Sequence, residues 1–131
     1  MTEIEKVREY FEFDVFATGV TGIKIEEIAE RYALCTLELD SRHKNAANQV
    51  MGGVIFTLAD FTFAVSANRP NCPVTVTTNA NVSFIGRVMG DRLIAESKLL
   101  KDGKRTCFYE ISVKDDKNNL IAIVTVTGTK L

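Results

Sequence analysis

The longest apolar stretch of the chain lies near its middle, over residues 52–68. Its apolar residues fall on nearly every side of a helix: Val54, Ile55, Phe56, Leu58, Ala59, Phe61, Phe63, Ala64 and Val65. A helix without a polar face is a buried helix, because it has no side to offer to water. The segment Asn-Arg-Pro-Asn-Cys-Pro at residues 68–73 then ends the pattern. These residues therefore predict one long central helix.

The spacing of polar and apolar residues elsewhere predicts one more helix and six strands. Apolar residues at helical spacing predict a short amphipathic helix over residues 2–11, whereas two glycines make residues 13–22 irregular. Runs rich in β-branched residues, bounded by turn residues, predict strands over residues 20–28, 31–39, 74–84, 92–100, 106–113 and 120–129. Alternation in one of these strands places Cys107, Tyr109, Ile111 and Val113 on one face.

This order of elements indicates an α+β fold. Short hairpin turns such as residues 101–104 join the later strands, so the sheet is expected to be antiparallel. One long apolar helix beside a run of strands predicts a strongly curved sheet wrapped around that helix. The length of 131 residues suits one domain, residues 1–131, and not two. Such a sheet keeps an open edge and an open face, which self-association would cover.

Composition and charge exclude several classes of function. The net charge of −1 does not suit a nucleic-acid binder, and the basic residues near the hairpin at 98–105 are interpreted as a solvated face. The longest apolar runs, residues 51–59 and 120–126, are too short to cross a membrane, and the mixed-charge start is not a signal peptide. Three widely spaced cysteines without a C-x-x-C pair predict reduced thiols in a cytoplasmic protein, with no metal site.

Asp60 is the candidate that stands out by its surroundings. Between Lys44 and Arg87 the only charged residues are Asp60 and Arg69. A carboxylate in the apolar helix costs free energy to desolvate unless it is paired, hydrogen-bonded or open to a cavity. Burial would raise its pKa toward that of a general base. A capped or salt-bridged structural aspartate is the alternative, and isolation alone leaves the two equally open.

The residues Met51-Gly52-Gly53 come just before the helix. Two glycines leave backbone N–H groups uncovered at the positive end of the helix dipole, where they could hold an oxyanion. An ordinary glycine-rich helix entry is the alternative. Asp60 follows Gly52 by eight residues, about 12 Å along a helix, which is too far for both to act on one carbon. In a two-fold dimer with antiparallel helices, Gly52 of one subunit would lie near Asp60 of the other.

Residues 43–60, HKNAANQVMGGVIFTLAD, resemble the signature H-x-N-x(5)-H-G-G-x(4)-L-A-D. This is the signature of the PaaI-type (phenylacetic acid pathway) thioesterases of the hotdog superfamily. The similarity extends over roughly residues 30–131, including the segments at 76–84 and 90–93. The resemblance implies the hotdog fold and hydrolysis of small acyl-CoA thioesters, with arylacetyl-CoA among the candidates. It implies no cofactor and no metal, and an obligatory homodimer that is expected to form a dimer of dimers.

The resemblance also implies roles for four residues. Asp60 matches the aspartate that activates water or attacks the thioester directly. Gly52 matches the glycine whose N–H polarises the thioester carbonyl, and Asn45 matches an asparagine that places substrate or water. Thr77 matches a hydroxyl residue that holds the water. In the family, Asn45 and Gly52 come from one subunit, and Asp60 and Thr77 from the other.

One departure from the signature concerns Met51, which stands where the family usually has histidine. Methionine keeps the bulk of that side chain but loses its hydrogen bonding. It raises the alternative of a non-hydrolytic acyl-CoA-binding or sensing protein, and a plain interaction domain is the third hypothesis. A second departure is Gly86-Arg87 where the family often has Arg-Pro, which suggests a different entrance to the site.

Further substrate-binding candidates flank these positions. Gly53 and Met51 belong to the glycine turn, and Phe56 offers apolar surface to an acyl group. His43, the only histidine, is interpreted as a loop-stabilising or substrate-edge residue. Lys104 and Arg105 could meet coenzyme A phosphates, as basic side chains do in relatives.

Overall fold

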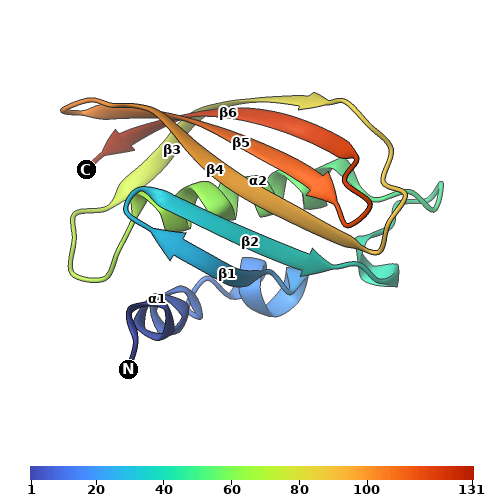
Figure 1. Cartoon of the computed structure of the whole chain (residues 1–131), viewed down its shortest axis with the longest axis horizontal. Helices are drawn as coiled ribbons and strands as arrows, with labels where there is room; N and C mark the ends of the chain where they lie inside the picture. Colours follow the sequence, from blue (N-terminus) through green and yellow to red (C-terminus); the bar gives the residue numbers. More distant parts are fainter.

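The computed structural model describes all residues 1–131, and its main feature is one curved six-stranded sheet that wraps around a helix (Figure 1). The strand order is β1-β2-β4-β5-β6-β3, and every neighbouring pair is antiparallel. The elements are α1 (Glu3–Phe11), η1 (Phe16–Thr21), β1 (Lys24–Ala29), β2 (Tyr32–Glu38), η2 (Ser41–His43), α2 (Gly52–Ala67), β3 (Thr75–Phe84), β4 (Arg92–Asp102), β5 (Thr106–Asp115) and β6 (Leu120–Lys130). This is the α+β arrangement that the sequence predicts.

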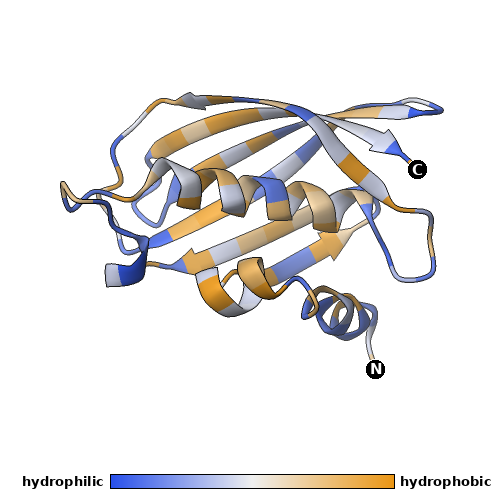
Figure 2. Cartoon of the chain, turned by 180° about the vertical axis from the view of Figure 1, so that it is seen from behind, coloured by the Kyte–Doolittle hydropathy of each residue, from blue (hydrophilic) through white to orange (hydrophobic).

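Helix α2 is the centre of the core. Many hydrophobic positions lie on α2 and on the strands behind it in Figure 2, and the buried residues of the helix and the sheet form one cluster. The ring of Phe63 meets that of Tyr109 edge to face, with centroids 5.3 Å apart. The inward row predicted for β5 is confirmed, because Cys107, Tyr109, Ile111 and Val113 are all buried. Burying such side chains contributes roughly 1.5–3 kcal/mol each, so α2 is held by the sheet rather than by its own propensity.

Strand β3 is an edge of the sheet, because it pairs only with β6. The pairing passes from Thr77–Gly128 to Asn79–Thr127, so Thr78 is an extra residue in β3. Such a β-bulge kinks the strand and redirects its side chains. Thr75 and Thr77 before the bulge, and Val82 after it, can therefore all face the helix side of the sheet.

Two expectations for the N-terminal region are wrong. Residues 16–21 form a π-helix, η1, rather than an irregular segment, because Ala17 and Thr21 pack inward from it. The first strand begins at Lys24 instead of residue 20, since η1 ends at Gly22, whose φ of 93° suits glycine. The other expected elements begin and end within two residues of those observed.

Three further features bear on the class of protein. No helix combines the length and apolar character required to span a bilayer. Cys35 and Cys107 are buried thiols in the core, and Cys72 is exposed in the loop after α2. No group of three or more His, Cys, Asp or Glu side chains is arranged to hold a metal ion.

Candidate active site

The N-terminus of α2 carries two backbone donors without partners. Met51 precedes the helix in an extended conformation and provides no side-chain cap. The N–H of Val54 donates to the Met51 carbonyl at 3.0 Å, whereas the N–H groups of Gly52 and Gly53 make no hydrogen bond within the chain. Unpaired N–H groups at this end of a helix favour negative charge. The glycine turn can therefore receive an anion or a developing oxyanion.

The loop before the glycine turn is closed on itself by Asn45. Its side-chain oxygen accepts hydrogen bonds from the N–H groups of Ala47 (2.9 Å) and Gln49 (3.1 Å). Its own N–H donates to the Gln49 carbonyl at 2.8 Å. The oxygen is thus used by the loop, which leaves the Asn45 amide N–H₂ as the group that can reach a substrate or a water.

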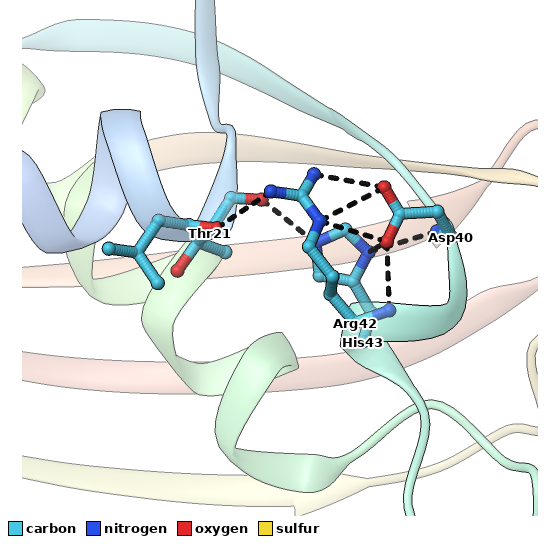
Figure 3. Close-up of polar contacts among 5 residues, drawn as sticks. Thr21, Asp40, Arg42 and His43 are labelled. Atoms are coloured by element: carbon cyan, nitrogen blue, oxygen red, sulfur yellow. Dashed lines mark hydrogen bonds and ion pairs between the residues drawn. The ribbon is translucent and has the colours of Figure 1, made fainter.

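His43 anchors the same loop (Figure 3). Its Nδ1 accepts from the Asp40 N–H at 3.0 Å, and its Nε2 lies 2.8 Å from the Thr21 carbonyl, so Nε2 carries the proton. Arg42 binds the Asp40 carboxylate and the Val20 carbonyl alongside it, and its hydrogen bond lowers the pKa of Asp40 to about 2. His43 is only 2% exposed. Its contacts favour the loop-stabilising role over a position at the substrate's edge.

Asp60 lies in the middle of α2, on a half-buried face. The Thr77 hydroxyl of β3 donates to its Oδ1 at 2.8 Å, and no other hydrogen bond reaches this carboxylate from within the chain. Burial raises the pKa of Asp60, the bond from Thr77 opposes this, and the negative charge of Asp14 adds to the rise. A carboxylate with spare acceptor capacity and a raised pKa is equipped to take a proton.

The candidate residues form two groups rather than one. Asp60 and Thr77 lie together at the middle of α2, whereas Asn45, Gly52 and Gly53 lie at its N-terminal end. The eight-residue separation along the helix corresponds to about 12 Å. Within one chain these two groups are therefore too far apart to act on one atom.

The side chains of Phe84 and Met51 cover the glycine turn, and Phe84 was not among the residues predicted from the sequence. A Cβ placed on Gly52 would lie 3.1 Å from Cζ of Phe84, and one on Gly53 would lie 3.2 Å from Cε of Met51. Phe84 comes from the end of β3 and is 58% exposed. The sequence feature that could have identified Phe84 is an aromatic residue at the end of an edge strand. Asp14 was also missed, because its effect on Asp60 depends on how η1 packs against α2.

The remaining candidates lie in different places. Phe56 is half-buried one turn before Asp60 on the same side of α2, while Phe61 and Phe63 belong to the core. Lys104 and Arg105 are exposed at the turn between β4 and β5. The Arg105 carbonyl accepts from the N–H at the end of β6, so this turn is fixed to the C-terminal strand.

Comparison with known proteins identifies the family. The model of the Thioesterase superfamily matches residues 47–122, more than half of the chain. The chain belongs to the Thioesterase superfamily. This member is 30% identical over 125 residues to a candidate esterase of Archaeoglobus fulgidus, across 95% of the chain and 80% of that protein. It is 27% identical over 114 residues to Escherichia coli acyl-coenzyme A thioesterase PaaI, across 86% of the chain and 80% of that enzyme.

Solved structures give the fold of this thioesterase-superfamily protein. Escherichia coli PaaI superposes with a TM-score of 0.86 at 22% identity, over 99% of the chain and 96% of PaaI. A Streptococcus pneumoniae thioesterase solved with coenzyme A gives 0.83 at 18% identity, over 94% and 95% of the two chains. The hotdog fold expected from the resemblance is thus confirmed, and the chain is an enzyme of the thioesterase class.

Proposed function

We propose that this protein hydrolyses small acyl-CoA thioesters, with arylacetyl-CoA among its candidate substrates. The observation that carries the proposal is the pair of half-sites on α2. One half is a half-buried carboxylate, Asp60, with a single hydroxyl partner, and the other is a glycine turn with two free N–H groups. The likeness to PaaI supports coenzyme A as the carrier of the acyl group.

In this proposal two copies of the chain complete each site. The open edge of β3 offers unpaired backbone groups to a second copy, and the half-buried face of α2 lies beside it. A two-fold axis can pair the α2 helices of two copies side by side in opposite directions. In such a pair, Gly52 at the start of one helix can lie beside Asp60 in the middle of the other. Two such dimers could associate further through their exposed faces.

The chemistry follows from these positions. A water oxygen bonds to the thioester carbon while Asp60 takes its proton, and Thr77 holds the carboxylate in place. The carbonyl oxygen gains negative charge and accepts a hydrogen bond from the Gly52 N–H. The C–S bond then breaks, and the departing thiolate takes the proton from Asp60. The alternative, direct attack by Asp60, would form a mixed anhydride, and a single turnover in ¹⁸O-labelled water would then label Asp60 in the protein.

The role of Gly52 can be tested by removing only its N–H. Gly52 is the first residue of α2, where proline is tolerated, and Met51 has ψ of 135°, which suits a residue before proline. Gly52→Pro should lower kcat about 10²–10³-fold through loss of one oxyanion donor. Gly52→Ala is the matched control, because it adds the same contact with Phe84 but keeps the N–H. Equal activity of the two variants would exclude the N–H as the oxyanion donor.

The shared site has its own test. Asp60→Asn and Gly52→Pro should each be inactive, but their co-expression would give mixed dimers with one intact site. About a quarter of the wild-type activity should then return, because random pairing leaves one site in four complete. Absence of any recovery in proven mixed dimers would mean that each site lies within one chain.

A second candidate is an acyl-CoA-binding protein that does not hydrolyse its ligand. It is favoured by Met51, which lies beside the glycine turn and cannot donate the hydrogen bond of a histidine. An assay for free thiol over a panel of aliphatic and arylacetyl-CoA esters separates the two functions. Saturable binding without thiol release would support the binding protein and exclude the hydrolase.

A further inference from the structure

A cavity lies at the opposite end of α2 from the glycine turn. Its volume is about 550 Å³, and its lining includes neither Asp60 nor Gly52. Its lining includes residues from the end of α2, the turn from β1 to β2, and the end of β6. Figure 1 shows these segments near the same end of the molecule. Three cations line it: Arg31, Arg69 and Lys130.

These cations have few carboxylate partners of their own. Arg69 is half-buried and donates to the carbonyls of Val65, Asn68 (2.9 Å) and Ala29 (2.8 Å), but no carboxylate lies within ion-pair distance of it. Burial accordingly lowers the pKa of its guanidinium.

Arg31 and Lys130 share a single carboxylate. Asp102 lies 3.3 Å from the Arg31 Nε and 2.7 Å from the Lys130 Nζ. Glu3 and Glu30 also line the cavity, but both are exposed at its rim. The lining therefore holds three cations and two carboxylates, and the charge of Glu3 acts on Arg69 without forming an ion pair with it.

The hydroxyl groups of Thr75 and Tyr109 have no hydrogen-bond partner within the chain. The Thr75 hydroxyl makes no hydrogen bond within the chain, and its oxygen is accessible, although Thr75 as a whole is only 7% exposed and lines the cavity. The Tyr109 hydroxyl is buried without a partner. Burial raises the pKa of Tyr109 to about 12, and the nearby charges of Arg31 and Arg69 act against that rise. Of these two hydroxyl groups, only that of Thr75 lies in the lining, where a ligand in the cavity could reach it.

Capping of the helix accounts for only part of this arrangement. Arg69 binds the last carbonyls of α2, which is a common role for a cation at a helix C-terminus. Capping requires neither a cavity of this size nor the unused Thr75 hydroxyl beside it. Lys104 and Arg105, on the turn fixed to Lys130, add positive charge near the cavity.

We propose that this cavity is a binding site for the phosphate group of a small molecule, held by Arg69, Lys130 and the Thr75 hydroxyl. A guanidinium offers paired donors to phosphate oxygens, an ammonium offers a compact charge, and a hydroxyl can donate to a third oxygen. The phosphate belongs either to the nucleotide end of a coenzyme A thioester or to a separate phosphorylated ligand. Only the first source depends on the function proposed above.

Binding without turnover tests the site directly. Inorganic pyrophosphate and adenosine 3′,5′-bisphosphate, titrated calorimetrically into the full chain, should bind the wild type. Arg69→Gln and Lys130→Gln should each weaken that binding at least about tenfold. Arg92→Gln, at the start of β4 and far along that strand from Asp102, is the matched control and should bind as the wild type does.

Folding is checked separately, because Arg69 also caps α2. Thr75→Val keeps the shape of the side chain and the backbone contacts, so it should weaken phosphate binding without a change in melting temperature. The proposal is wrong if neither probe binds the wild type, or if binding is unchanged in Arg69→Gln, Lys130→Gln and Thr75→Val.

Steady-state kinetics then distinguish the two sources of phosphate. If Lys130→Gln raises KM for a coenzyme A ester but not for the matching N-acetylcysteamine ester, which lacks phosphate, the phosphate belongs to the substrate. If KM is unchanged for both esters while pyrophosphate binding is lost, the ligand is a separate phosphorylated molecule. Failure of the wild type to hydrolyse any thioester would contradict the proposed function and leave the binding result intact.

Discussion

Asp60 and Asp115 are the same residue type in opposite surroundings. Asp115 is 1% exposed and accepts five hydrogen bonds, from the N–H groups of Met89, Gly90, Lys117 and Asn119 and from the Asn119 amide. Asp60 accepts one, from Thr77. Burial alone would raise both pKa values. The donors around Asp115 outweigh burial and hold its pKa well below the usual range, whereas the pKa of Asp60 is raised.

Under the proposed function, this difference separates a structural carboxylate, Asp115, from a reactive one, Asp60. Asp115 joins the segment before β4 to the turn between β5 and β6, and its lone pairs are occupied by that task. Asp60 keeps unused lone pairs at a half-buried surface. Carboxylates whose environments drive their pKa values apart are suited to different roles. Four experiments test whether Asp60 and Asp115 have these different roles.

The largest expected effect is on catalysis. Asp60→Asn should lower kcat for thioester hydrolysis about 10²–10⁴-fold, because it removes the general base. It should not lower stability, because it replaces a poorly solvated charge by a neutral amide of the same shape. Thiol release and urea unfolding measure the two quantities. Near-normal turnover in a folded Asp60→Asn variant would exclude Asp60 from the chemistry.

The matching change at Asp115 should act on stability instead. Asp115→Ala leaves several buried donors unpaired and should lower the free energy of unfolding by about 2–3 kcal/mol. Activity per folded molecule should stay close to that of the wild type, since Asp115 is not part of either half-site. Urea unfolding with an activity assay on the folded fraction checks this. A stable but inactive variant would reverse the roles assigned to the two residues.

The pH dependence of activity and of stability should separate as well. The pKa of Asp60 lies above the ordinary value of 3.8. Hydrolysis should therefore fall as the pH drops through that pKa, because protonated Asp60 cannot accept a proton from water. Asp115 has a depressed pKa, so the stability that it contributes is present above 3.8 and is lost as pH falls toward the folded value. A weakly acidic range should therefore exist in which the protein is folded but inactive. Activity that falls only together with unfolding would contradict this.

The smallest effects come from the neighbours of Asp60. Asp14→Asn removes a negative charge that raises the pKa of Asp60, so the acid limb of the pH–activity profile should move to lower pH. Added salt should weaken the influence of the Asp14 charge on Asp60 in the wild type. Thr77→Val removes a stabilising hydrogen bond and should move the limb to higher pH. Glu12→Gln is a control of equal charge change nearby. Shifts of the same sign in the two variants would mean that Asp60 does not govern the limb.

Much of the fold could be predicted from the sequence, because periodicity reports which side of each element is buried. The all-round apolar pattern of residues 52–68 and the alternation in β5 identified the core correctly. The isolation of Asp60 in its apolar surroundings also marked it as a candidate. These signals are local, so one sequence is enough to see them.

Contacts between distant segments could not be predicted in the same way. The ring of Phe84 over Gly52 depends on where β3 ends relative to α2, and the influence of Asp14 on Asp60 depends on η1. The π-helix itself follows from tertiary packing of Ala17 and Thr21 rather than from a sequence period. Such features arise only when the whole sheet has closed around the helix.

The extra residue Thr78 in β3 limits how this protein can change in length. Side chains alternate along a regular strand, so Thr77 and Val82, which are five residues apart, would face opposite sides of it. Both can face the helix only because Thr78 is left unpaired between them. Relatives that vary in the surface loops are free to insert and delete residues there. Between Thr77 and the end of β3, natural or designed variants should either keep both the residue count and the bulge, or lose one residue and the bulge together.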